Sequence, residues 1–254
     1  MFLLGIIRLI LIVITIIGFL FPITFLKPIS SHTHIYLKKL LYRVIIAIIG
    51  VRIKIHGNFT KRSKPKSTLF ISNHSSYLDV MVLGSVIRNL SFTPKKEVRK
   101  WPLIGFCAFI SDAIFVDRIN KRNSIKNNKE ILRNILNGKN VHIFPEGTTN
   151  NGRELLNFKT SLISVVEESE VNFCSIAIIY KKINWRKIKG DEIDLVAWHG
   201  TASLLPHMIR LFSKLSVEVH LYFKIYDKKH TQLSRKEFTK NARDFIAEKL
   251  RSSF

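Results

Sequence analysis

Apolar residues dominate the start of the chain and recur periodically over the rest. The segment Leu9–Leu26 contains no charged residue and is rich in isoleucine and leucine, and its length is near the lower limit for a helix that crosses a bilayer. A second apolar run, Val44–Val51, is too short to cross and lies between basic residues, which is typical of an interfacial helix. We therefore expect residues 1–50 to attach the protein to a membrane and residues 51–254 to form a globular domain.

The charges next to these two runs predict their orientation. Four basic residues follow the first run: Lys27, Lys38, Lys39 and Arg43. By the positive-inside rule this flank lies in the cytoplasm. A cleaved signal peptide is a weaker interpretation, because only Arg8 precedes the run and no small-residue cleavage site follows it. Either the first run crosses the membrane once, or both runs form a hairpin that dips into one leaflet.

After residue 50, short apolar runs alternate with segments of helical periodicity. The runs predict strands at Val51–Ile55, Thr68–Ile71, Ser91–Thr93, Ala113–Val116, Val141–Phe144, Asn172–Tyr180, Asp194–Trp198 and Val217–Lys224. The periodic segments predict helices at Tyr77–Leu83, Phe106–Ile110, Ser124–Asn137, Met208–Leu215 and Arg235–Leu250. This order is typical of an α/β domain with a mixed, largely parallel sheet flanked by helices, whose functional loops lie at strand ends.

The net charge limits the partners that the chain can have. With 41 basic and 18 acidic side chains, the formal charge is +23, which favours a phospholipid surface, a nucleic acid or an acidic protein or substrate. The basic residues are spread along the chain rather than gathered in a stripe with aromatic residues, so a nucleic-acid module is disfavoured. Cys107 and Cys174 lie far apart in apolar surroundings, which predicts buried thiols with neither a disulfide framework nor zinc spacing.

The turn after Thr68–Ile71 carries a histidine and a carboxylate. On one regular helix His74 and Asp79 would point about 140° apart, because each residue turns by roughly 100°. A turn before a helix capped by Ser76 lets the carboxylate fold back onto one imidazole nitrogen and leaves the other free as a base. The alternative is that Asp79 only caps the helix, worth about 1 kcal/mol, and that His74 is an ordinary turn residue.

Two more strand ends carry polar groups directly after an apolar run. They are Phe115–Arg118 and Phe144–Thr148. If the three strands are neighbours in the sheet, a base, an arginine and a glycine-containing loop converge on one crevice. Such a set suits acyl transfer to a phosphorylated alcohol.

Taken together, these segments resemble the glycerolipid acyltransferase family, specifically bacterial 1-acyl-sn-glycerol-3-phosphate acyltransferases. His74 and Asp79 match its N-H-x-x-x-x-D block. The second and third blocks are matched by Lys95, Pro102, Gly105 and Phe115–Arg118, and by Phe144–Thr148 with Gly152, Arg153, Phe158 and Lys159. Asn172–Tyr180 occupies the place of the fourth block. The resemblance covers residue 50 to the C-terminus, and ordered blocks are far more specific than one motif.

The resemblance implies an activity and roles for single residues. His74 is the base that takes the proton of the acceptor hydroxyl, and Asp79 orients it. The acceptor-binding set that it implies is Arg118, Glu146, Gly147, Thr148 and Lys95. The acyl chain comes from acyl-CoA or acyl-carrier protein as a co-substrate, with no acyl-enzyme, cofactor or metal. The acceptor is lysophosphatidic acid, the product is phosphatidic acid, and the work is done on the cytoplasmic face of the inner membrane.

Two positions depart from the family pattern. Thr149 stands where the third block usually continues with arginine, which affects how an acceptor phosphate is held. Ser175 and Ala177 lie where the fourth block usually has a proline. One alternative is therefore an acyltransferase that acts on another lysolipid, such as lyso-ornithine lipid. A non-enzymatic alternative is a membrane-tethered basic module that binds anions, supported by the charge and the apolar N-terminus.

Overall fold

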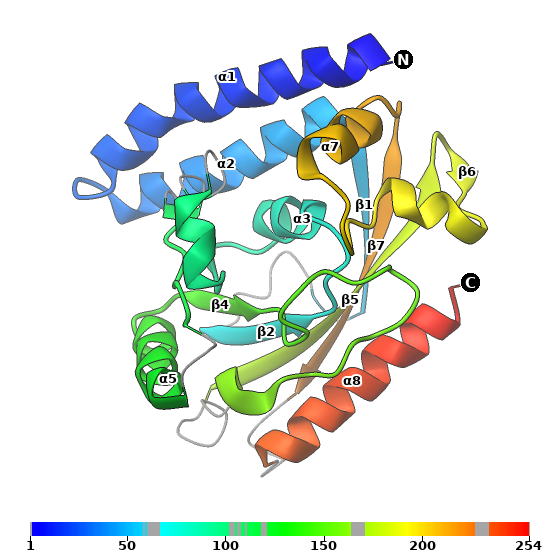
Figure 1. Cartoon of the computed structure of the whole chain (residues 1–254). Coiled ribbons are helices and arrows are strands. Elements are labelled where there is room, and N and C mark those ends of the chain that lie inside the picture. Colours follow the sequence, from blue (N-terminus) through cyan, green and yellow to red (C-terminus); the bar gives the residue numbers. More distant parts are fainter. Residues whose placement is uncertain are drawn as a thin grey trace.

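The computed structural model describes residues 2–57, 59, 67–101, 105, 108–109, 111–117, 121–163, 171–226 and 234–253. Its centre is a seven-stranded sheet of order β1-β7-β5-β2-β4-β3, with β6 paired to β5 (Figure 1). The strands are β1 (Val51–His56), β2 (Thr68–Ser72), β3 (Leu90–Phe92), β4 (Asn140–Ile143), β5 (Asn172–Ile183), β6 (Arg186–Lys187) and β7 (Val217–Tyr226). β5 pairs antiparallel with β7 and β6, and the other pairs are parallel. The predicted mixed, largely parallel sheet is therefore confirmed.

Helices cover both faces of this sheet. The α-helices are α1 (Phe2–Leu26), α2 (Ser31–Ile49), α3 (Leu78–Val86), α5 (Lys121–Leu136), α7 (Leu204–Phe212) and α8 (Arg235–Arg251). The 3₁₀ helices of the described segments are η1 (Lys96–Lys100), η2 (Thr160–Leu162) and η3 (Gly190–Leu195). One core contains residues of α1, α2, α3 and α7, and the opposite core contains residues of α5 and α8. Figure 1 shows α1 as the outermost layer, running over α2 and α7.

The central strands are apolar on both sides because both sides are covered. In β2, Leu69 and Ile71 join the core under α5 and α8, whereas Phe70 joins the core under α3. Successive side chains of a strand point to opposite faces, so a strand buried on both faces reads as a continuous apolar run. β2 is flanked by β5 and β4 in parallel register, which brings the turns after β2 and β4 to the same edge.

Two of the predicted strands are wrong. Asp194–Trp198 is not a strand, because η3 occupies Gly190–Leu195. The buried residues Ile193, in η3, and Val196, directly after it, recur at the three-residue spacing of a 3₁₀ turn. Ala113–Val116 runs beside β3 and forms only one isolated bridge, between Val116 and Lys95.

The structure describes one of the two cysteines that were predicted to be buried, and only part of one predicted helix. The helix predicted at Phe106–Ile110 falls mostly outside the described residues, as does Cys107. Cys174 is buried as predicted, and burial raises the pKa of its thiol. A protonated, inaccessible thiol is unreactive, so Cys174 is a packing residue.

Helix α1 is long and apolar enough to cross a membrane, yet it packs on the domain along its length. Gly5, Ile12, Ile16 and Ile23 form its buried side, and from Gly5 to Ile23 they cover about 27 Å of helix. At its N-terminal end the Arg8 guanidinium donates to the carbonyl oxygens at the end of α7. The two N-terminal helices therefore share one core with the sheet, and a separate 1–50 anchor stays a prediction about function.

A largely buried carboxylate ties these two helices to the rest of the domain. Asp112 accepts hydrogen bonds from Lys27 at 2.6 Å, His34 at 3.0 Å and Lys38 at 2.9 Å, which come from the α1–α2 connection and from α2. Burial alone raises the pKa of the Asp112 carboxyl, but the three cationic or donating partners outweigh it and hold the pKa below its usual range. Acidification below that pKa is expected to loosen the helical hairpin.

The close approach between α2 and α3 gives a stability prediction. A Cβ at Gly84 would lie 2.5 Å from the Tyr42 ring, whereas a Cβ at Gly18 meets nothing within 4 Å. Both Gly→Ala changes gain the same helix propensity, about 1 kcal/mol, but only Gly84→Ala overpacks the core, at about 1–3 kcal/mol. We therefore expect the free energy of unfolding, measured with denaturant in detergent, to be about 1–3 kcal/mol lower for Gly84→Ala than for Gly18→Ala. Equal stabilities of the two variants would contradict the packing.

Candidate active site

The turn between β2 and α3 is held in a non-helical conformation by the neighbouring strand. The Asn73 amide donates to the carbonyl oxygen of Ile178 at 2.9 Å and accepts from its N–H at 2.8 Å. Ile178 belongs to β5, the strand next to β2. One side chain thus supplies the pairing that β2 loses where it ends. The residue that follows, His74, is presented at the sheet edge with 18% of its side chain exposed.

Asp79 orients the His74 imidazole as predicted from the sequence. The Nδ1 atom of His74 lies 2.9 Å from Oδ2 of Asp79. A carboxylate only accepts, so Nδ1 carries the hydrogen and the lone pair of Nε2 remains available. The same oxygen accepts the N–H groups of Ser75 and Ser76 at 2.8 and 2.9 Å, and Oδ1 accepts the Tyr180 hydroxyl at 2.7 Å.

The predicted cap of α3 is wrong by one position. The helix begins at Leu78 with Tyr77 as its N-cap, and that cap makes no side-chain hydrogen bond. Ser76 lies before it, and its Oγ accepts from the Leu78 N–H at 3.3 Å. The physical reason is that Asp79 reaches back to the N–H groups of Ser75 and Ser76, which keeps those residues out of the helix.

The turn after β4 encloses the other side of His74. The Phe144 ring stacks on the imidazole with centroids 3.7 Å apart and planes at 16°. Glu146 accepts the His74 N–H at 2.8 Å, and the Asn150 N–H donates to the His74 carbonyl at 2.7 Å. The ring and both peptide groups of the histidine are therefore fixed by one loop.

Glu146 is buried and its carboxylate is directed inward. Its second oxygen accepts the Asn150 amide at 2.6 Å and the Leu156 N–H at 2.8 Å. Burial raises the pKa of Glu146, and the hydrogen bonds from Asn150, Leu156 and His74 act against that rise. These contacts indicate that Glu146 positions His74. Binding of an acceptor by Glu146 stays a prediction.

The remaining predicted binding residues lie at different places around this turn. Gly147 is buried at a φ of +78° that favours glycine, and its N–H closes the turn onto the Phe144 carbonyl at 3.1 Å. The Thr148 side chain is exposed. Lys95 is exposed too, and its backbone pairs with Val116, two positions before Arg118. Arg118 itself lies outside the described residues.

Several residues of the site were not recognised as such from the sequence. Tyr180, which stabilises Asp79, is 101 residues away in the chain, and nothing local to it signals this contact. Burial and the nearby Asp79 raise the pKa of Tyr180 well above its usual value, so it stays a donor. His142 lies buried beside Phe144, and burial together with His74 lowers its pKa. It is therefore neutral and acts in packing.

Comparison with the sequences of known proteins identifies the family of this chain. A family model described as Acyltransferase matches residues 52–179. The lyso-ornithine lipid O-acyltransferase of Rhizobium meliloti is 33% identical over 189 residues, which are 72% of this chain and 63% of that protein. The 1-acyl-sn-glycerol-3-phosphate acyltransferase of Neisseria gonorrhoeae is 29% identical over 116 residues, 46% of this chain and 45% of that protein. The matches thus span 63% and 45% of these relatives.

A solved structure shares the fold. The crystal structure of the 1-acyl-sn-glycerophosphate (LPA) acyltransferase PlsC from Thermotoga maritima matches with a TM-score of 0.72 at 17% identity. The match covers 98% of this chain and 94% of that one. At this identity the likeness concerns the fold alone, and it includes the N-terminal helices.

Replacing Asp79 by asparagine tests the orientation of His74. The side-chain amide of the introduced asparagine can donate to Nδ1, which moves the hydrogen to Nε2 and removes the base. We expect kcat to fall by roughly 10²–10⁴-fold for any reaction that uses His74 as a base. Asp194→Asn is the matched control, because Asp194 pairs with His199, also five residues away, at the surface. Similar kcat values for the two variants would contradict the assignment.

Proposed function

This chain belongs to the acyltransferase family, and we propose that it is a lysolipid O-acyltransferase in which His74 is the general base. The observation that carries the proposal is the His74–Asp79 hydrogen bond, which leaves Nε2 free in a partly exposed turn. A hydroxyl group must lose its proton as it attacks an acyl carbon, and a positioned imidazole is suited to accept it. A module that only binds anions has no use for this arrangement.

The proposed reaction is a direct transfer. The acceptor hydroxyl gives its proton to Nε2 of His74, and its oxygen forms a bond with the thioester carbonyl carbon. The carbon–sulfur bond then breaks, and the imidazolium returns the proton to the departing thiolate. Asp79 stabilises the imidazolium between these steps. Ser75 and Ser76 are 1% and 0% exposed, which argues against a serine acyl-enzyme.

The acyl donor is proposed to be acyl-CoA or acyl-carrier protein. Both carry the acyl chain as a thioester, and both are acidic, so both complement a chain with a formal charge of +23. The chemistry at His74 is the same for either donor. No cofactor takes part in the steps described, since the thioester itself supplies the activated acyl group.

For the acceptor, we favour lyso-ornithine lipid over lysophosphatidic acid. The similarity to the Rhizobium meliloti protein supports it. The residue at position 149 supports it too, because a half-buried threonine offers no charge to a phosphate monoester. Arg153 pairs with Asp191 and is not a free replacement. Lysophosphatidic acid remains the second candidate, supported by the Neisseria gonorrhoeae relative and by the predicted ligand Arg118.

The proposed location is the cytoplasmic face of the inner membrane, with α1 in one leaflet. The outer side of α1 exposes large apolar side chains, among them Ile10, Ile14, Ile17, Phe21 and Phe25. A helix that contacts its own domain from end to end is better placed along a membrane surface than across it. This arrangement favours the hairpin in one leaflet over a single crossing.

Replacing His74 tests the reaction. We expect His74→Ala to lower kcat by about 10²–10⁴-fold or more with both lysolipids and both donors. Membrane association should be unchanged, because His74 lies away from α1 in the catalytic turn. His199→Ala, at the surface pair with Asp194, is the control. Near-normal turnover of purified His74→Ala protein would refute the acyltransferase mechanism.

Replacing Thr149 tests the acceptor. An arginine at position 149 adds a charge-assisted contact of about 1.5–3 kcal/mol to a phosphate. We therefore expect Thr149→Arg to raise kcat/KM for lysophosphatidic acid by about tenfold or more and to leave lyso-ornithine lipid without a gain. Thr201→Arg, at an exposed threonine outside the predicted binding set, controls for added charge. A wild-type preference for lysophosphatidic acid would replace our favoured acceptor by the second candidate.

A further inference from the structure

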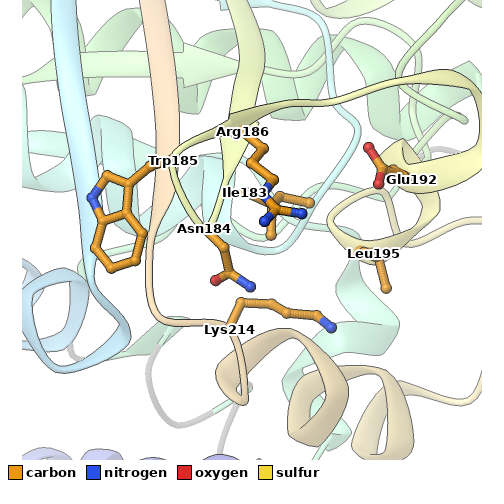
Figure 2. A pocket seen from close by; sticks show the side chains of 7 residues that line it. All are labelled: Ile183, Asn184, Trp185, Arg186, Glu192, Leu195 and Lys214. Carbon is orange, nitrogen blue, oxygen red and sulfur yellow. The ribbon is translucent and has the colours of Figure 1, made fainter.

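A cavity lined by polar and apolar side chains lies away from the turn that contains His74. It has a volume of about 510 Å³ and is bordered by the β5–β6 hairpin, η3 and the segment after α7 (Figure 2). Its wall includes Ile183, which is five residues beyond Ile178, the partner of Asn73 in the active site. Along an extended strand this separation is about 16 Å. The cavity is therefore distinct from the site that contains His74.

The hairpin at its rim holds a tryptophan in an unusual backbone conformation. Asn184 and Trp185 form the two-residue turn between β5 and β6, with φ of +50° and +65°. Such turns favour glycine at the second position. Asn184 fixes the turn, because its N–H donates to Ser216 at 2.9 Å and its Oδ1 accepts from the Leu215 N–H at 2.7 Å. Trp185 is nevertheless 54% exposed. The Arg52 guanidinium lies over the indole, 5.8 Å from the ring centroid. The remaining surface of the strained tryptophan is open to a contact outside the chain.

Two cations line the same cavity. Figure 2 shows the side chains of Arg186 and Lys214 extending toward one hollow. Within the described part of the chain neither makes an ion pair. Glu192 also lines the cavity, and its carboxylate accepts the Lys189 N–H at 2.9 Å. The formal charge of the lining is thus positive by one unit. Lys181 and Lys187 of the hairpin add to it, whereas Lys182 pairs with Glu218 at 3.3 Å.

The cavity adjoins the apolar N-terminal helix. Arg8 of α1 donates to the carbonyl oxygens of Phe212 and Lys214, so the cationic wall of the cavity lies beside the first turns of α1. Near this contact α1 exposes Ile7 and Ile10, and Leu215 next to Lys214 is 49% exposed. A tryptophan, exposed aliphatic residues and basic side chains together are typical of the interfacial region of a bilayer.

We propose that the β5–β6 hairpin is a second membrane contact, in which Trp185 enters the interfacial region and Arg186 and Lys214 bind the phosphate of an anionic phospholipid. The hairpin and α1 then rest on the same bilayer surface. Charge complementarity identifies the occupant: the cavity offers two cations without an ion pair among the described residues, and the surface beside α1 is apolar rather than acidic. The proposal does not depend on the reaction at His74.

The experiment uses the full chain with Trp101→Phe and Trp198→Phe, so that Trp185 is the single indole. The protein is reconstituted in phosphatidylcholine vesicles with increasing phosphatidylglycerol, and lipids labelled near the headgroup quench its fluorescence. We expect quenching that grows with phosphatidylglycerol. In the double variant Arg186→Gln/Lys214→Gln, half-maximal quenching should need at least about five times more anionic lipid.

The control removes the same charge elsewhere. Lys236→Gln/Lys240→Gln alters exposed residues of α8, on the face of the sheet opposite α1 (Figure 1), and should leave the midpoint unchanged. A second control is Trp185→Gly in the chain that keeps Trp101 and Trp198, because glycine suits the turn. This variant should lose the part of the fluorescence that the lipid labels quench. It tests the contact without relying on the fold of the single-indole variant.

Three outcomes would overturn the proposal. The first is quenching of Trp185 by an aqueous quencher only, in every vesicle. The second is an equal shift caused by the α8 control. The third is a response of Trp185 to inorganic phosphate in detergent without vesicles, which would make the cavity a site for soluble anions. Activity is not measured, so failure here is independent of the proposed acyl transfer.

Discussion

The site depends on one buried anion. The Asp79 carboxylate is 0% exposed, and removing a charge from water costs several kcal/mol unless hydrogen bonds compensate. Its four donors are the His74 ring, the N–H groups of Ser75 and Ser76, and the Tyr180 hydroxyl. Two of these donors are backbone N–H groups, which would bond to carbonyl oxygens of the chain if α3 began earlier. They can bind the carboxylate because the chain forms a turn here instead of a helix. The orientation of the base follows from the same bonds that stabilise the local fold.

A second carboxylate, that of Glu146, stabilises the same turn from the neighbouring loop. Glu146 accepts the His74 N–H, and its loop returns a bond to the His74 carbonyl through Asn150. The strand order β5-β2-β4 makes this possible, because parallel strands end at one edge. β5 lies on the other side of β2 and supplies Ile178 to Asn73 and Tyr180 to Asp79. The three central strands thus each contribute to the position of one imidazole, which is the preorganisation that general-base catalysis requires.

The sequence predicts those features that depend on residues close to one another in the chain. The apolar runs of β2 and β4 and the polar turns that follow them are visible in the sequence, and so is the possibility that Asp79 bends back to His74. The contacts of Tyr180 and Asn150 were not predictable, because they join segments that only the sheet brings together. The strand predicted at Asp194–Trp198 is wrong because its apolar positions suit both a strand and a 3₁₀ turn. Ile193 and Val196 pack in the core that contains residues of α7, and this packing favours the turn. Arg118, the predicted ligand of an acceptor phosphate, lies outside the described residues, so its role stays a prediction from the sequence.

Helix α1 and the turn that presents His74 are connected through α7. Gly5 of α1 lies so close to the Ile209 carbonyl that a Cβ could not fit, which fixes α1 against α7. On the other side of α7, burial lowers the pKa of His207, and this neutral imidazole donates to the Ala197 carbonyl and accepts from the Tyr77 hydroxyl. The Trp198 N–H then donates to the Ser75 carbonyl, one residue from His74. A continuous chain of contacts thus leads from the exposed apolar helix to His74. Under the proposed function, in which a lipid acceptor stays in the bilayer, these contacts set the distance between α1 and the proposed base.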